Sequence, residues 1–252
     1  MSAPPASSFS GYDGTRLAYR QLGSGRTLIL VHGYLSTANT NWIRYGQAAL
    51  LANHGFRVVM PDLRAHGGSD HPHDPNAYPA DVLVDDGLAL VEHLRLTDYD
   101  LGGYSLGARV AARMVVRGAT PGRIVLAGTG LRGLTDAAES SRYFRGVFAG
   151  LGRHLRGTDE WQAEAFLRTN HGDPVALERI LDTLVDTPPS LLAGIRMPAL
   201  VVVGEDDEGQ ASADQLAAVI PRSTFVEIPG THMSAVTKPG LAEAIADFLT
   251  GA

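Results

Sequence analysis

The chain has 252 residues, of which 44% are hydrophobic and 19% are charged, a balance typical of a globular protein rather than a disordered one or a coiled coil. Its formal net charge of -6 lacks the basic excess that binding to a phosphate backbone requires, so we expect no nucleic-acid partner. The chain has no cysteine, which excludes disulfides, thiolate metal sites and cysteine catalysis.

The beginning of the chain does not look like a targeting segment. Residues Met1 to Ser10 are small and polar and lack the positive cluster and apolar run of a secretory signal. The longest apolar runs, such as Leu28 to Val31 and Ala199 to Val203, are too short to cross a bilayer. We therefore expect a cytoplasmic protein with no membrane partner.

The first half of the chain alternates strand-like and helical patterns. A turn at Tyr12-Asp13-Gly14 between two short apolar stretches predicts an antiparallel hairpin at the edge of a sheet. Continuous apolar runs and segments with helical spacing then alternate along the chain. The runs are Thr27 to Val31, Arg57 to Met60, Tyr99 to Gly103 and Arg123 to Ala127, and the helical segments are Trp42 to Asn53, Asp81 to Leu94 and Leu106 to Arg117. This alternation indicates a parallel sheet with helices on both faces, that is, a doubly wound α/β fold.

The alternation stops after Gly130 and returns with a strand at Ala199 to Val203, a helix from Ala213 to Ile220, a strand from Thr224 to Ile228 and a final helix from Leu241 to Leu249. Glycine-broken helical patterns fill residues 131–195, and a structureless loop of that length is rare in a compact protein. We therefore predict one core domain, residues 1–130 and 196–252, with a helical cap inserted at residues 131–195.

One segment of the predicted cap carries an apolar stripe at helical spacing, formed by Tyr143, Phe144, Val147, Phe148 and Leu151. The stripe has two interpretations. It packs a helix on a core, or it forms the roof of a pocket over Ser105, in which case Phe144 and Phe148 would bind substrate; the two can hold together.

The pentapeptide Gly103-Tyr104-Ser105-Leu106-Gly107 stands where a predicted strand runs directly into a predicted helix. In that setting G-x-S-x-G is the nucleophile elbow of a serine hydrolase. The turn holds the serine in a strained backbone conformation, and side chains two positions to either side would collide, so glycine is needed at both places. The start of the following helix would stabilise an oxyanion formed there.

A serine hydroxyl needs a base to accept its proton and an acid to orient that base. His232 is the histidine that lies in a loop just after the last predicted strand, at the same sheet edge as Ser105. The acid is expected in Gly204-Glu205-Asp206-Asp207, which follows the strand ending at Val203. The chain order serine, acid, histidine is the order that this topology requires.

These motifs resemble those of the α/β-hydrolase family, and the resemblance runs from the hairpin to the last helix. It implies a mostly parallel eight-stranded sheet, and its G-x-x-D turn favours Asp207 over Asp206 as the acid. His32-Gly33-Tyr34 is similar to the family's oxyanion loop, which assigns the oxyanion hole to the backbone N–H groups of Tyr34 and Leu106 and a supporting role to the His32 ring. Tyr34 is also expected to contact substrate.

Asp62-Leu63-Arg64-Ala65-His66-Gly67 resembles a structural turn of the same family, although Ala65 stands where glycine is usual. We read this segment as a turn rather than a metal site, because a third ligand is missing at the required spacing. No cofactor and no metal are expected.

The resemblance implies hydrolysis of a small carboxylic ester, or of a related acyl compound, through an acyl-enzyme. Alternatives stay open: a triad-bearing lyase or C–C bond hydrolase acting on a carboxylate-containing metabolite, a cofactor-free peroxidase, or a low-turnover ligand receptor. The lyase alternative depends on Arg109 and the cap arginines, which either bind a substrate carboxylate or form a solvated face. The sequence also leaves a homodimer open.

Overall fold

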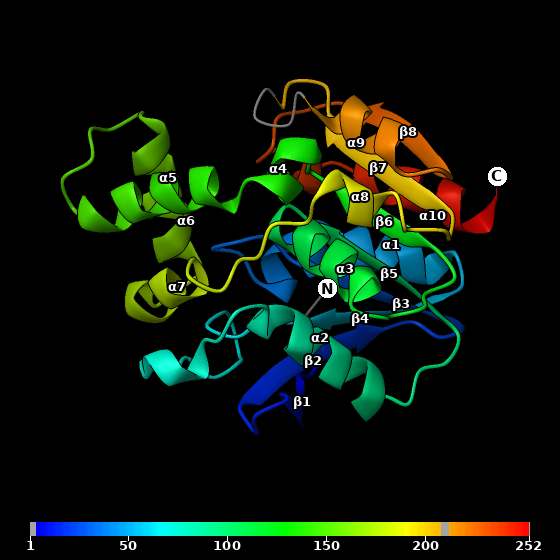
Figure 1. Cartoon of the computed structure of the whole chain (residues 1–252), viewed down its shortest axis with the longest axis horizontal. Helices are drawn as coiled ribbons and strands as arrows, with labels where there is room; N and C mark the ends of the chain where they lie inside the picture. Colours follow the sequence, from blue (N-terminus) through cyan, green and yellow to red (C-terminus); the bar gives the residue numbers. More distant parts are fainter. Residues whose placement is uncertain (1–3, 208–211, 252) are drawn as a thin grey trace.

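The computed structural model describes residues 4–207 and 212–251. Its centre is an eight-stranded sheet with the order β1-β2-β4-β3-β5-β6-β7-β8 (Figure 1). The strands are β1 (Ser7–Ser10), β2 (Arg16–Leu22), β3 (Arg26–Val31), β4 (Phe56–Pro61), β5 (Tyr99–Tyr104), β6 (Ile124–Ala127), β7 (Ala199–Gly204) and β8 (Ser223–Ile228). Strand β2 pairs antiparallel with β1 and β4, and the other neighbours pair parallel. This confirms the predicted sheet and its edge hairpin.

Helices cover both faces of the sheet. Helices α2 (Val82–His93), α3 (Leu106–Val116) and α9 (Ala213–Val219) pack on one face, and α1 (Gln47–Asn53) and α10 (Gly240–Thr250) pack on the other. Along β3, Ile29 and Val31 face the first layer, whereas Leu28 and Leu30 face the second. Because both sets are buried, the strands are continuously apolar instead of alternating.

The helix predicted over Trp42 to Asn53 is wrong in its first part. A short π-helical turn, η1 (Asn39–Ile43), precedes α1, which begins only at Gln47. Between them Gly46 has φ +85°, a left-handed conformation that ends one helical segment and starts the next.

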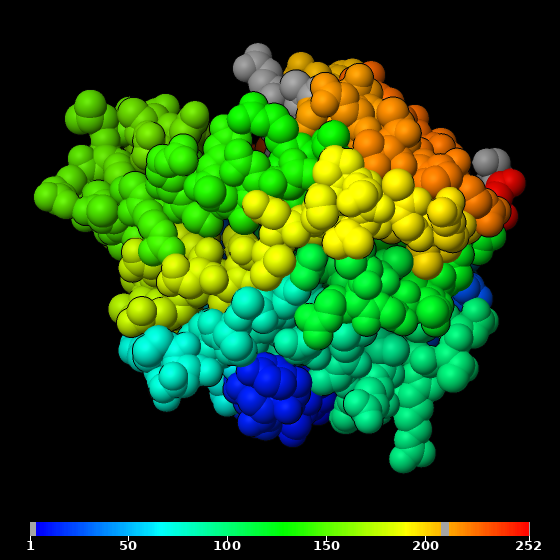
Figure 2. Space-filling model, in the orientation of Figure 1, coloured from blue at the N-terminus to red at the C-terminus, as the bar shows by residue number. Residues whose placement is uncertain are grey.

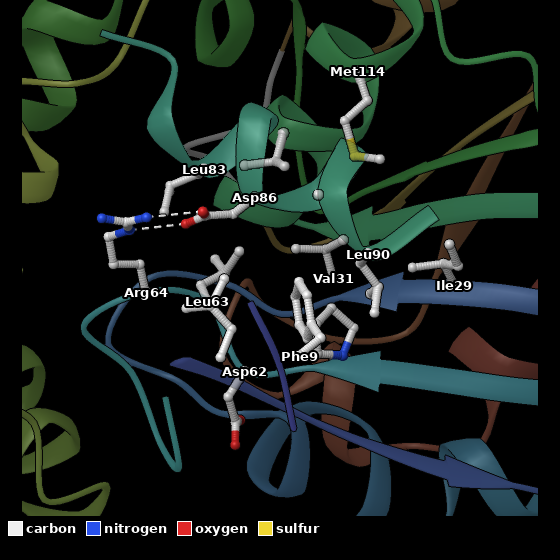
Figure 3. A pocket seen from close by; sticks show the side chains of 14 residues that line it. Phe9, Ile29, Val31, Asp62, Leu63, Arg64, Leu83, Asp86, Leu90 and Met114 are labelled. Carbon is white, nitrogen blue, oxygen red and sulfur yellow. Dashed lines mark hydrogen bonds and ion pairs between the residues drawn. The ribbon is translucent and has the colours of Figure 1, made fainter. Parts of the chain in front are cut away.

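The turn that contains Arg64 has a structural role, as the sequence predicts. The fully buried Arg64 guanidinium donates from Nε and Nη2 to Asp86 at 2.9 Å and from Nη1 and Nη2 to Asp13 at 2.8 Å. Figure 3 shows the Arg64–Asp86 pair beside a small, mostly apolar cavity between the sheet and helices α2 and α3. Ser105 does not line this cavity, which belongs to the core.

Residues 131–195 form five helices: α4 (Leu131–Thr135), α5 (Ala137–Ala149), α6 (Asp159–Thr169), α7 (Pro174–Ile180) and α8 (Pro189–Leu192). Side-chain oxygens of Asp136, Thr158 and Asp173 accept backbone N–H groups at the starts of α5, α6 and α7, which fixes where each begins. Helices α5, α6 and α7 project together to one side of the sheet (Figures 1 and 2), whereas α8 packs on α3. The division into core and cap remains a prediction.

Across the two described ranges, no helix combines the length and apolar character needed to span a bilayer.

Candidate active site

The turn from β5 into α3 has the strained geometry that the sequence predicts. Ser105 has φ +55° and ψ −114°, outside the common regions for a non-glycine residue. A Cβ atom at Gly103 would lie 2.2 Å from the carbonyl carbon of Gly107, and one at Gly107 would lie 2.1 Å from the carbonyl oxygen of Val31. The two glycines therefore allow α3 to start directly against the sheet.

The structure brings Ser105, His232 and Asp207 into one hydrogen-bonded line. His232 Nε2 lies 3.2 Å from Ser105 Oγ, and His232 Nδ1 lies 2.7 Å from Asp207 Oδ2. The Asp207 side chain is 2% exposed, whereas the Asp206 side chain is exposed, and the Asp206 amide donates to the Gly230 carbonyl. A carboxylate at Nδ1 holds the tautomer whose free Nε2 lone pair faces the serine hydroxyl.

Sequence reasoning missed one residue that holds this line in place. The Tyr104 hydroxyl donates to the backbone carbonyl of His232 at 2.7 Å, and the two rings lie 5.3 Å apart. Burial raises the pKa of Tyr104 well above its usual value, so the hydroxyl stays protonated and remains a donor. Its position directly before Ser105 in the elbow is the sequence feature that could have pointed to this role.

The two amides predicted to form an oxyanion hole are available. Within the part of the chain that the structure describes, no protein acceptor takes the N–H of Tyr34 or of Leu106, and Leu106 is the first residue of α3. The adjacent Gly33 amide donates to Asn41 Oδ1 at 3.0 Å, which fixes the loop. Two unpaired amides near Ser105 and a helix N-terminus suit a developing negative charge.

The His32 ring supports this loop, as the sequence predicts. His32 Nε2 accepts the Leu63 amide at 3.0 Å, and His32 Nδ1 donates to the Gly33 carbonyl at 2.8 Å. Burial lowers the pKa of His32 to about 4, so the ring is neutral at neutral pH and holds both bonds.

Ser105 opens onto two cavities, which we call the inner cavity and the outer cavity; Tyr34 lines both. The inner cavity lies beneath the helices of residues 131–195. The outer cavity is the larger of the two and is the one that His232 lines. The inner cavity is lined, besides Ser105 and Tyr34, by Leu106, Arg109, Gly128, Thr129, Gly133, Ser140, Phe144, Leu181 and Leu184.

The two aromatic residues predicted to contact substrate differ in position. Phe144 lines the inner cavity, and its ring packs edge-on against Tyr34 with centroids 4.6 Å apart. Phe148 also packs against Tyr34, at 6.4 Å, but lines neither of the two cavities. The Tyr34 hydroxyl donates to the Leu177 carbonyl of α7 at 2.7 Å, so one residue joins the oxyanion loop to the predicted cap.

Three of the seven arginines in residues 131–195 pair with carboxylates of the same segment. Arg132 pairs with Glu139, Arg145 with Asp182, and Arg168 with Glu164, and all three guanidinium groups are at least 42% exposed. Arg109 on α3 differs, because it is buried and lines the inner cavity.

His73 links two segments of the chain. Its Nε2 lies 2.6 Å from Oδ2 of Asp173, the residue that precedes α7. Over residues 4–207 and 212–251, no group of three histidines and carboxylates has the arrangement to hold a metal ion.

Comparison with known proteins agrees with this fold. The α/β hydrolase fold family matches over residues 26–179, and the chain belongs to this family. A crystal structure of a hydrolase from Pseudomonas aeruginosa PA01 is 28% identical, with a TM-score of 0.79, covering 98% of this chain and 99% of that one. A thermophilic esterase from Thermogutta terrifontis is 25% identical, with a TM-score of 0.78 and 98% of each chain covered.

Among curated relatives, a non-heme haloperoxidase from Rhodococcus erythropolis is 37% identical over 42% of this chain. The match covers 36% of that relative's own length. The proteins to which the chain is similar thus include esterases, haloperoxidases and epoxide hydrolases.

Proposed function

We propose that the protein is a serine hydrolase that cleaves a carboxylic ester through an acyl-enzyme. The observation that carries the proposal is the hydrogen-bonded line Ser105–His232–Asp207, which begins at a strained elbow serine. The esterase of similar structure supports the ester as substrate class.

In this mechanism Ser105 Oγ attacks the ester carbonyl while His232 Nε2 accepts the hydroxyl proton. Asp207 stabilises the imidazolium that forms, and the amides of Tyr34 and Leu106 donate to the oxyanion. His232 then protonates the leaving alcohol. Water, activated by the same imidazole, releases the acid and restores Ser105.

The haloperoxidase relative favours a second candidate on the same residues. Hydrogen peroxide is a small nucleophile like water, and its attack on the acyl-enzyme would give a peracid instead of the acid. Both candidates require acylation of Ser105, so they differ only in the second half of the reaction.

The test is hydrolysis of 4-nitrophenyl butyrate by the wild type and by Ser105→Ala. We expect Ser105→Ala to lower kcat by at least about a thousandfold, because removal of any triad member disables the unit. Ser140→Ala, which removes another serine hydroxyl near the inner cavity, is the matched control and should change kcat far less. Equal rates for the wild type and Ser105→Ala would refute the proposal.

A further inference from the structure

Three arginine side chains in the described part of the chain are almost completely buried, and one of them uses only one of its three nitrogens. Arg64 is surrounded by Asp13, Asp86 and the Ala77 carbonyl, and each of its guanidinium nitrogens donates to at least one of them. Arg113 donates to Asp81 from both Nε and Nη2.

Arg109, with a side chain that is 7% exposed, makes a single hydrogen bond, from Nη1 to the Val185 carbonyl at 3.0 Å. Its Nε and Nη2 meet no acceptor among the residues that the structure describes.

The nearest carboxylate compensates the Arg109 charge poorly. Asp186 Oδ1 lies 3.6 Å from Arg109 Nη1, belongs to a half-exposed side chain and already accepts the Ala137 amide at 2.7 Å. Burial lowers the pKa of Arg109, and Asp186 offsets that effect only in part. By contrast, the carboxylates around Arg64 raise its pKa above the ordinary value despite burial. The Arg109 side chain is therefore largely buried beside the inner cavity, and its Nε and Nη2 have no acceptor among the described residues.

The position of His232 decides which half of an ester lies near Arg109. The group that protonates the leaving oxygen must reach it, and His232 lines the outer cavity but not the inner one. The alcohol half then occupies the outer cavity and the acyl half the inner cavity. Arg109 lies one helical turn after Ser105 on α3, on the same side of the helix, and lines the inner cavity.

We propose that the acyl half of the substrate ends in a carboxylate that Arg109 binds in the inner cavity, so that the substrate is a half-ester of a dicarboxylic acid. This inference rests on the proposed function. Leu106, Phe144 and Leu184 give the same cavity apolar walls that suit a methylene linker. Folding has already removed most of the water around this side chain, so a carboxylate gains a charged hydrogen bond at a reduced desolvation cost.

The experiment compares pairs of ethyl esters that differ only in a terminal carboxylate. Monoethyl succinate, glutarate and adipate are matched with ethyl butanoate, pentanoate and hexanoate, and kcat/KM is measured in a pH-stat. We expect at least one half-ester to exceed its neutral partner by about tenfold or more, the effect of one charged hydrogen bond. Chain length should matter, because the distance from Ser105 to Arg109 is fixed.

Substitution at Arg109 tests the assignment. Arg109→Gln should lower kcat/KM more for the preferred half-ester than for its neutral partner, so that their ratio falls about tenfold, and Arg109→Lys should keep part of the preference. Arg145→Gln, in which the lost arginine pairs with Asp182 at the surface, is the control and should leave the ratio unchanged.

The outcomes separate this inference from the proposed function. If kcat/KM of the wild type for the neutral esters equals or exceeds that for the matched half-esters, the inference is overturned and the serine hydrolase stands. If no ester is hydrolysed by the wild type, the proposed function fails as well. Should the Arg109 variants not fold, competitive inhibition of the wild type by glutarate or adipate, at concentrations where hexanoate has no effect, supports the inference, and equal inhibition overturns it.

Discussion

Asp206 and Asp207 are chain neighbours in opposite surroundings, which makes them a test of the site at the scale of one residue. Asp207 is buried against His232 Nδ1, whereas Asp206 is exposed. We expect Asp207→Asn to lower kcat for ester hydrolysis by about four orders of magnitude, because the amide no longer stabilises the imidazolium and favours the wrong tautomer. Asp206→Asn should change kcat little. Steady-state kinetics of the two variants decide the matter, and the reverse ranking would move the acid to Asp206.

Ala65 stands where the resemblance to the family's turn predicts glycine, and its backbone conformation is strained. Ala65 is fully buried with φ +64°, a conformation that costs a non-glycine residue roughly 1 kcal/mol. We therefore expect Ala65→Gly to leave the free energy of unfolding unchanged or to raise it by up to about 1 kcal/mol, since glycine's greater freedom in the unfolded chain offsets part of the gain. Ala111→Gly, at a buried position inside α3, is the control and should lower it. Urea denaturation gives both values, and a similar loss in the two variants would contradict the strain.

The residues of the proposed triad could be predicted because each stands in a local motif at the end of a strand. The hydrogen-bond partners of Tyr104 and Arg109 could not be predicted from the sequence. Tyr104 bonds a residue 128 positions away, and Arg109 bonds one 76 positions away, across segments without periodic patterns. That Arg109 lacks further acceptors depends on how residues 131–195 fold, and no local pattern records this.

At the scale of elements, the contact between α3 and the sheet depends on Gly107. A methyl group there would lie 2.1 Å from the Val31 carbonyl oxygen, so Gly107→Ala must push α3 away from β3. We expect a loss of several kcal/mol in the free energy of unfolding, or no folded protein, by the cost of overpacking. Gly146→Ala, in α5 with open space around the position, is the control and should raise stability by up to about 1 kcal/mol. Thermal unfolding followed by circular dichroism compares them, and equal effects would contradict the close approach.

The strands of the sheet were predictable because burial on both faces makes each a continuous apolar run. Helix boundaries were less predictable than strands, because the left-handed Gly46 divides a segment whose apolar spacing is continuous. Within residues 131–195, the helical stripe predicted a helix but not which side faces Ser105. In the structure Val147 is fully buried in this helix, as core packing predicts, and Phe144 lines the inner cavity, whereas Phe148 does not. Contact of Phe144 with substrate stays a prediction.

At the scale of the whole molecule, two buried histidines link stability to pH. The rings of His32 and His66 lie 5.0 Å apart, and burial lowers their pKa values to about 4 and about 3. In the unfolded chain both histidines have a pKa of about 6.5. Between that pH and about 4 the unfolded state therefore binds protons that the native state does not bind. The free energy of unfolding should therefore decrease as the pH is lowered across this window, by up to about 1.4 kcal/mol per pH unit for each histidine.

The variant His66→Gln removes one of these two groups and should weaken the decline by about half between pH 6.5 and 4.5. Free energies of unfolding from urea titrations at several pH values measure the slope. An unchanged slope would show that the buried pair does not control acid stability.

The central claim is that Ser105 is the nucleophile which His232 and Asp207 activate, and covalent labelling tests it most directly. The wild type is incubated with a fluorophosphonate, and the adduct is located by mass spectrometry of its peptides. We predict one adduct, on the peptide that contains Ser105, no adduct on Ser105→Ala, and much slower labelling of His232→Ala. Rapid labelling of another serine, or equal labelling of Ser105→Ala, would contradict the account.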